Sequence, residues 1–255
     1  MWQVVGATVI GTGHIKRSIP CQDAFQYDID EESNSVIVAV ADGIGSAAKA
    51  DIGSSFVVEE VIRCVKEQLE VKDSASECVE EVLLSSIKRT KEGLQVLADS
   101  ENISVEEFGT TLVVALLDCF GISVAHIGDG AVVLQMADKS LYTLSKPHRG
   151  EYENETFSLT SSNAEKFIRI STLKEDVRCV ALMTDGLQRL SLSYPTASPH
   201  APFFLPLFER LEYEIDTKQA SSQLERFLLS ERVCSKTSDD KTLVLAARIG
   251  AEQTA

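Results

Sequence analysis

The sequence predicts an α+β fold in which antiparallel β-sheets are packed by pairs of helices. Short apolar segments come first, and two long amphipathic helical segments then follow each other with no strand between them. Four further strand-like segments come next, separated by tight turns, before more helices and a last strand. This order does not alternate strand with helix as parallel α/β folds do. Because there is no internal repeat and no Pro/Gly-rich linker, we expect one domain over residues 1–255.

The N-terminal part of the chain contains two predicted strands and the helix pair. Residues 1–10 and 36–41 are short, apolar and rich in β-branched side chains, as strands are. Between them, "YDIDEE" is polar and predicts a turn. From 49 to about 70, apolar residues recur every three or four positions, which is the period of a helix face. A second helix follows, with an apolar face made of Val79, Val82, Leu83, Ile87, Leu94 and Leu97.

Strand signals return after residue 109. The segments "TTLVVALLDC", "GISVAHIG", "AVVLQM" and "SLYTLS" are joined by short turns and predict an antiparallel meander. Residues 146–176 are polar and irregular, which predicts a loop or flap. "VRCVALMT" predicts another strand, and helical patterns cover about 203–213 and 217–230. The segment "KTLVLAARI" predicts the last strand.

Composition argues against several classes of protein. The 255 residues carry a formal net charge of −15, which repels phosphate backbones and anionic lipid, so we expect no nucleic-acid and no membrane partner. No apolar run approaches the ~20 residues that cross a bilayer. The N-terminus lacks a basic leader followed by an apolar core, and we expect a cytoplasmic protein. The cysteines form no C-x-x-C pair or C-x5-R signature, and the histidines lack zinc-ligand spacing.

The stretch "VIVAVADGIGSAAKADIGS", residues 36 to 54, has two competing interpretations. Gly43, Gly45 and Ala48 form a G-x-G-x-x-A pattern, which is typical of a dinucleotide-binding turn. That site also needs a second parallel strand and an acidic residue about 20 positions further on. Here Glu59 and Glu60 fall in the middle of a predicted helix, and another helix follows. The context therefore disfavours a dinucleotide site and leaves the aspartate at the strand end to be explained.

Aspartates recur where apolar strands meet turns. An Asp–Gly pair is a common turn, so each position alone is more often structural than functional. Repeated delivery of carboxylates to strand ends is harder to dismiss, because antiparallel strands can gather such ends at one edge. Gathered carboxylates repel one another unless cations neutralise them, and an all-oxygen site suits Mg²⁺ or Mn²⁺. The residues concerned are Asp23, Asp42, Asp129, Asp185 and Asp240.

The order of these motifs resembles that of a known family. "QDAF", "VADGIG", "GTTL", "HIGDG", "MTDGL" and "DDKTL" are similar to the serial motifs of the metal-dependent type 2C serine/threonine protein phosphatases. The resemblance runs from about residue 6 to 248, and the long helix pair between the second and third motifs also fits. It implies a four-layer αββα sandwich, with two antiparallel sheets flanked by helices and a binuclear metal centre at one edge.

The resemblance also implies a role for each matching residue. Asp42 would bridge two Mn²⁺ or Mg²⁺ ions, and the Gly43 carbonyl would bind one of them. Glycine suits that position, because a side chain would obstruct the approach of the backbone to a cation. Asp185 and Asp240 would hold the other ion, and Asp23 would contact the centre directly or through water.

Hydrolysis then follows from the two ions. The resemblance implies that Asp129 serves a third, weaker metal found in some members. A water that bridges two cations loses a proton near neutral pH and can attack phosphorus, while the cations neutralise the phosphoryl oxygens. No protein nucleophile is needed, which agrees with the missing C-x5-R and G-x-S-x-G motifs.

The chain departs from the family pattern at several positions. The usual phosphate-binding arginine is replaced by Ser18, so Arg17 is the candidate for that role, with His14 in the same loop as a second one. Ile44 replaces a histidine that follows D-G in many eukaryotic members. The other departures are Gly130, Ala131 and Lys241. Together they indicate a divergent branch of bacterial type.

We therefore expect a monomeric phosphatase that acts on phosphoserine and phosphothreonine and opposes a Ser/Thr kinase. The alternative is a non-catalytic relative that binds a phosphorylated partner or acts as a regulatory scaffold. The presence of Asp42, Asp185 and Asp240 favours catalysis, because a scaffold has no need to bear their mutual repulsion. The predicted flap, 146–176, is where we expect substrate specificity to lie.

Overall fold

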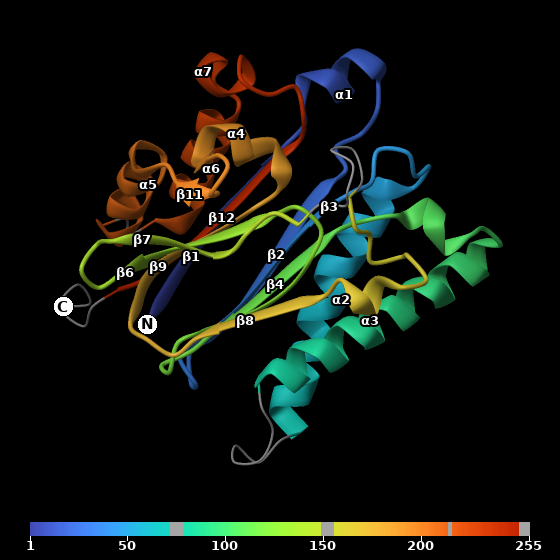
Figure 1. The fold of residues 1–255 in the computed structure, drawn as a ribbon, viewed down its shortest axis with the longest axis horizontal. Helices are drawn as coiled ribbons and strands as arrows, with labels where there is room; N and C mark the ends of the chain where they lie inside the picture. Colours follow the sequence, from blue (N-terminus) through green and yellow to red (C-terminus); the bar gives the residue numbers. More distant parts are fainter. Residues whose placement is uncertain (72–78, 149–155, 214–215, 250–255) are drawn as a thin grey trace.

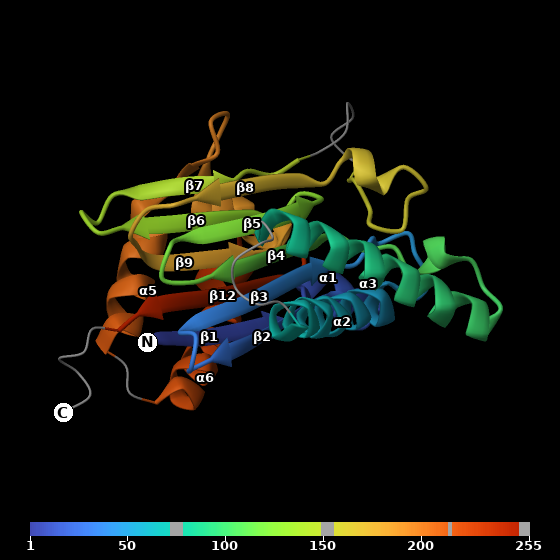
Figure 2. The same cartoon turned by 90° about the horizontal axis from the view of Figure 1, so that it is seen from below.

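Two antiparallel sheets face each other, and helices cover the outer face of each (Figures 1 and 2). The computed structural model describes residues 1–71, 79–148, 156–213 and 216–249. The helices α2 (Ala50–Val71) and α3 (Val79–Glu101) lie on one side, and α5 (Ala201–Tyr213) and α6 (Thr217–Leu228) lie on the other. This arrangement confirms the predicted αββα sandwich.

The first sheet joins the two ends of the chain. Its strand order is β1-β12-β9-β6-β7. Along β1, each residue from Trp2 to Val9 pairs with one of β12, so the first and last strands are neighbours throughout their length. The bounds are β1 (Trp2–Val9), β12 (Lys241–Arg248), β9 (Val177–Met183), β6 (Ala131–Met136) and β7 (Leu141–Ser145).

The second sheet carries the strand that opens the Asp–Gly motif at 42 and 43. Its order is β2-β3-β4-β5-β8. The strand β3 is second from the edge and has apolar neighbours on both faces: Val38 packs between the sheets, and Ala39 packs toward α2 and α3. The bounds are β2 (Asp23–Asp30), β3 (Ser35–Asp42), β4 (Leu112–Leu117), β5 (Ile122–Ile127) and β8 (Arg169–Leu173).

Short elements connect these layers. None of the described helices is both long and apolar enough to cross a membrane. The short helices are α1 (Thr12–Arg17), α4 (Gln188–Ser191) and α7 (Glu231–Cys234), with 3-10 turns η1 (Val105–Phe108), η2 (Ala164–Lys166) and η3 (Asp185–Leu187). A two-stranded ribbon pairs β10 (Leu192–Ser193) with β11 (Ser198–Pro199).

The predicted meander after residue 109 is wrong in its pairing. The four strands exist, but β4 and β5 form a hairpin in one sheet, whereas β6 and β7 form a hairpin in the other. The turn between β5 and β6 carries the chain from sheet to sheet, and Gly128 there has φ +109, which favours glycine. This crossing places the central residue of "GDG", Asp129, at the edge where the two sheets meet.

Two strands appear where loops were predicted. The segment that includes "YDIDEE" is the edge strand β2, which pairs with β3, and the expected flap contains β8 at the opposite edge. Edge strands keep many side chains half-exposed, so their sequences contain polar residues that resemble those of loops. The rest of the predicted flap includes 149–155, which lies outside the described residues.

Candidate metal centre

Three carboxylates meet at one end of the sandwich. Asp42 is the last residue of β3, Asp129 lies between β5 and β6, and Asp185 begins η3 after β9. One oxygen from each lies within 4.8 Å of the other two, and Asp129 is buried. Three such groups offer the hard oxygen ligands that Mg²⁺ and Mn²⁺ prefer. Elements far apart in the sequence thus bring three of the predicted aspartates together.

Asp23 supplies an unpartnered oxygen beside this group. It is the first residue of β2 and pairs in register with Asp42. Its Oδ2 accepts hydrogen bonds from the hydroxyls of Thr184 (2.6 Å) and Thr242 (2.9 Å). Its Oδ1 is buried, and within the described ranges it has no hydrogen-bond partner. A buried carboxylate oxygen without a partner is costly, and a cation or a water bound to it would remove that cost, so the donor set fits a metal.

The carboxylates shift each other's protonation. Burial raises the pKa of Asp42 well above its ordinary value, and the nearby charges of Asp23, Asp185, Asp129 and Asp239 raise it further. Burial also raises the pKa of Asp23 to about 8, although the two threonine hydroxyls lower it. Both shifts have the direction expected when like charges share a site that lacks a compensating cation.

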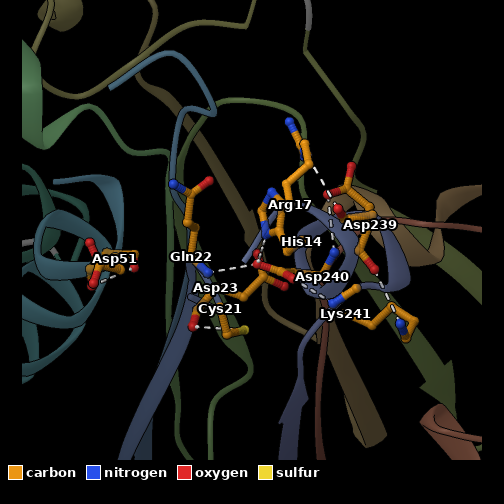
Figure 3. A network of polar contacts seen from close by, with 12 residues as sticks. His14, Arg17, Cys21, Gln22, Asp23, Asp51, Asp239, Asp240 and Lys241 are labelled. Carbon is orange, nitrogen blue, oxygen red and sulfur yellow. Dashed lines mark hydrogen bonds and ion pairs between the residues drawn. The ribbon is translucent and has the colours of Figure 1, made fainter. Parts of the chain in front are cut away.

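Asp240 is not part of the three-carboxylate group. Its Oδ1 accepts from the backbone N–H of Gly11 at 2.6 Å. Its Oδ2 accepts from the backbone N–H of Gln22 at 2.6 Å and lies 2.8 Å from His14 Nδ1 (Figure 3). Through these hydrogen bonds, Asp240 links the segment between β1 and β2, which includes α1, to the start of β12. These donors already engage both oxygens.

Asp239 is the acidic residue that the sequence analysis did not single out. It precedes Asp240, its side chain is exposed, and its charge contributes to the raised pKa of Asp42. The sequence contains two adjacent aspartates in "DDKTL", and either could be the one that faces the metal centre. In the structure the second aspartate is enclosed by hydrogen-bond donors, whereas the first remains accessible.

The two candidate phosphate-binding residues lie on α1. His14 is buried against Asp240, so its ring helps to hold the loop in place. Arg17 is the last residue of the helix and is exposed, and its Nε donates to the Gly13 carbonyl at 3.2 Å. Ser18 ends the helix with φ 55 in the left-handed region. The Arg17 side chain is therefore exposed to solvent, whereas the His14 ring is buried.

Close packing requires glycine at position 43. A Cβ at this position would lie 2.8 Å from the Ala50 Cβ and 2.9 Å from the Gln22 Cβ. Its N–H donates to the Gln22 carbonyl at 3.0 Å. Within the described part of the chain, no backbone N–H donates to the Gly43 carbonyl, which leaves this oxygen available.

Comparisons with known proteins match this fold and site. The family model for protein phosphatase 2C matches residues 10–229. The chain is 32% identical to serine/threonine-protein phosphatase 3 of Escherichia coli (strain K12), over 96% of this chain and 98% of that protein. It is 25% identical to the probable protein phosphatase 2C 69 of Oryza sativa subsp. japonica over 47% of this chain and 26% of that one.

Solved structures show the same architecture. The serine/threonine phosphatase Stp1 from Staphylococcus aureus superimposes with a TM-score of 0.65 at 19% identity, covering 98% of this chain and 96% of that one. PppA from Pseudomonas aeruginosa gives 0.63 at 17% identity, covering 96% and 97%. RsbX, in a complex with magnesium, gives 0.56 at 16% identity, covering 96% and 94%.

The sandwich with carboxylates gathered at its edge is that of a metal-dependent phosphatase. The chain belongs to the protein phosphatase 2C family, and it is a serine/threonine protein phosphatase.

Proposed function

We propose that the chain hydrolyses phosphoserine and phosphothreonine in proteins by using two Mn²⁺ or Mg²⁺ ions bound at the carboxylate cluster. The observation that carries the proposal is the convergence of Asp42, Asp129 and Asp185 within 4.8 Å. When bound, the ions would lower the pKa of a bound water, so that it can lose a proton and attack phosphorus as hydroxide, and their charge would neutralise the phosphoryl oxygens. The family comparison supports the same activity.

The carboxylates have distinct proposed roles. Asp42 would contact both ions, and the Gly43 carbonyl would contact one. Asp185 and Asp239 would complete the ligand set, because Asp239 is the accessible member of the doubled aspartate. Asp129 would hold a further, weaker ion. This distribution replaces the family-based role of Asp240, whose oxygens are engaged by Gly11, Gln22 and His14.

Asp23 and Asp240 would position the centre. Asp23 directs Oδ2 to two threonine hydroxyls and leaves Oδ1 for an ion or for a water on that ion. Asp240 holds the segment that carries Arg17, whose exposed guanidinium would bind the phosphoryl oxygens. A guanidinium matches phosphate geometry through paired N–H donors. His14 would act through Asp240, as a positioning residue.

The alternative, a non-catalytic phosphopeptide-binding scaffold, is less well supported. Burial and mutual repulsion raise the pKa of Asp42 and Asp23, so the cluster destabilises the metal-free fold. A scaffold gains nothing from that cost, whereas a metal centre requires it. The predicted monomeric state, cytoplasmic location and opposing kinase stay predictions.

A panel of phosphopeptides tests the proposal. Purified protein is incubated with matched phosphoserine, phosphothreonine and phosphotyrosine peptides, with Mn²⁺ or with a chelator, and released phosphate is measured. We expect release from the first two peptides only with the metal. Saturable peptide binding without metal-dependent release would instead support the scaffold.

A further inference from the structure

A cavity lies between the outer helices α5 and α6 and the first sheet. Its volume is about 570 Å³, which falls in the range of small-molecule sites. Val5 and Leu245, from the neighbouring strands β1 and β12, are buried and line it together with Phe203 and Leu224 from the helices. None of the acidic residues of the metal centre lines it. The wall of the cavity between the sheet and the helices is therefore apolar.

Basic side chains surround this apolar interior. Arg189, Arg210, Arg232 and Lys236 all line the cavity and are exposed, and no aspartate or glutamate lines it among the residues that the structure describes. Arg189, Arg232 and Lys236 form no ion pair with any residue in the described ranges. A cationic lining is unexpected on a chain of net charge −15. An apolar interior with a cationic mouth complements a ligand with an apolar body and an anionic head.

A buried amide adds a polar contact inside the cavity. Gln223, on α6, lines the cavity, and its Oε1 is buried with no hydrogen-bond partner among the described residues. Buried polar atoms normally find partners, so an unsatisfied amide in a cavity wall points to a missing one. The oxygen itself can only accept, but the side-chain amide can turn by about 180°, which places its NH₂ group there to donate to an anionic oxygen.

We propose that this cavity binds a small amphipathic anion, with an apolar chain or ring between α5 and α6 and a carboxylate or phosphate held by Arg189, Arg232 and Lys236. The cavity volume and the buried sheet residues Val5 and Leu245 in its lining favour a small molecule over a protein segment. The cavity also adjoins the metal centre through α4. Arg189 follows Gln188, whose Nε2 donates to the backbone carbonyl of Asp129.

Binding of a defined probe tests the proposal. Dodecanoate is titrated into the full chain in a calorimeter below its micellar concentration, with dodecyltrimethylammonium as the probe of equal chain and opposite charge. We expect saturable binding of one dodecanoate per chain and at least about tenfold weaker binding of the cation. Equal binding of the two probes, or no saturable binding of dodecanoate, contradicts the proposal.

Charge-reversal variants locate the site. In Arg232→Glu/Lys236→Glu, both changes are at exposed positions of the cavity mouth, and dodecanoate affinity should fall at least about tenfold. The control Lys88→Glu/Lys174→Glu changes net charge equally at exposed positions outside the cavity and should bind as the unmodified chain does. Equal loss in both double variants contradicts the site.

Other occupants and loss of folding are separate outcomes. Thermal unfolding verifies that each variant is folded, and dodecanoate should raise the melting temperature of the unmodified chain and of the control. Sedimentation velocity tests the alternative that a second copy of the chain covers this face. A dimer that dissociates in Arg232→Glu/Lys236→Glu and excludes dodecanoate would overturn the small-molecule proposal.

Discussion

Asp23 and Asp42 are register partners at the same end of the antiparallel pair β2 and β3. Both carboxyl groups are costly to ionise: burial and the charge of Asp23 raise the pKa of Asp42. Burial raises the pKa of Asp23 to about 8, and the charges of Asp240 and Asp185 also raise it. The pairing of β2 with β3 therefore holds two carboxylates close together, where their negative charges repel each other. A divalent cation bound between them would attract both carboxylates and offset this repulsion.

The first prediction concerns stability and pH in the absence of metal. In the unfolded chain Asp23 titrates near its ordinary 3.8, and in the folded chain near 8. The folded state therefore binds more protons over this interval, so the free energy of unfolding should fall as pH rises from about 4 to about 8. Urea unfolding at pH 5 and pH 8 with a chelator measures it.

Asp23→Asn is the control for that pH dependence. The variant removes one titrating group, so its free energy of unfolding should fall less steeply over the same interval. Mn²⁺ should stabilise the unmodified chain more at pH 8 than at pH 5, because it competes with protons for carboxylates. Identical pH slopes for the variant and the unmodified chain would show that Asp23 keeps an ordinary pKa.

The second prediction separates Asp239 from Asp240. Asp239→Asn should raise the Mn²⁺ concentration for half-maximal activity at least about tenfold and leave the melting temperature unchanged, because the side chain is exposed. Asp240→Asn should lower the free energy of unfolding by about 1–3 kcal/mol, because the amide NH₂ cannot accept from the buried N–H groups of Gly11 or Gln22. The reverse pattern would assign the metal to Asp240.

The third prediction uses two glycines of the metal-site loops. A Cβ at Gly186 would lie 1.9 Å from the Asp240 carbonyl oxygen, so Gly186→Ala should cost at least about 2 kcal/mol of stability and weaken Mn²⁺ binding by displacing Asp185. A Cβ at Gly45 would meet nothing within 4 Å. Gly45→Ala, the matched control, should therefore fold and hydrolyse normally; a loss equal to that of Gly186→Ala would refute this steric explanation.

The fourth prediction concerns Arg17. If its guanidinium binds the substrate phosphate, Arg17→Ala should raise KM about tenfold, because a charge-assisted hydrogen bond is lost. Lys16→Ala removes a neighbouring exposed charge from the same helix and should change KM little. Steady-state kinetics with a phosphothreonine peptide measure both. Equal KM values for the two variants would mean that a different cation binds the phosphate.

Most of the fold follows from patterns of apolar residues. Buried central strands such as β3 and β4, and the long helices α2 and α3, have periods that single segments reveal. The edge strand β2 was missed because its acidic residues conceal an alternation in which Phe25, Tyr27 and Ile29 pack between the sheets. The sequence also did not predict that the hairpins β4–β5 and β6–β7 belong to different sheets. Strands that follow each other usually pair, and no local pattern shows that the chain crosses between the sheets at Asp129.

The sequence predicts a cluster of aspartates, and the structure brings Asp42, Asp129 and Asp185 together, but the proposed role of each carboxylate could not be read from local patterns. Strand ends identified Asp42 and Asp185, because buried strands place their terminal residues at a sheet edge. The choice between Asp239 and Asp240 depends on long-range contacts to Gly11, Gln22 and His14, which no local pattern contains. The orphaned oxygen of Asp23 likewise becomes visible only when β9 and β12 bring two threonines to its other oxygen.

The most direct test of the central claim compares the unmodified chain with Asp42→Asn. The measurement is kcat/KM for a phosphothreonine peptide over a Mn²⁺ titration, with Mn²⁺ binding followed separately by calorimetry. We predict that the variant folds, binds Mn²⁺ more weakly and loses at least about 100-fold in kcat/KM, as the loss of a metal ligand requires. Equal Mn²⁺-dependent activity in the two proteins would contradict the account.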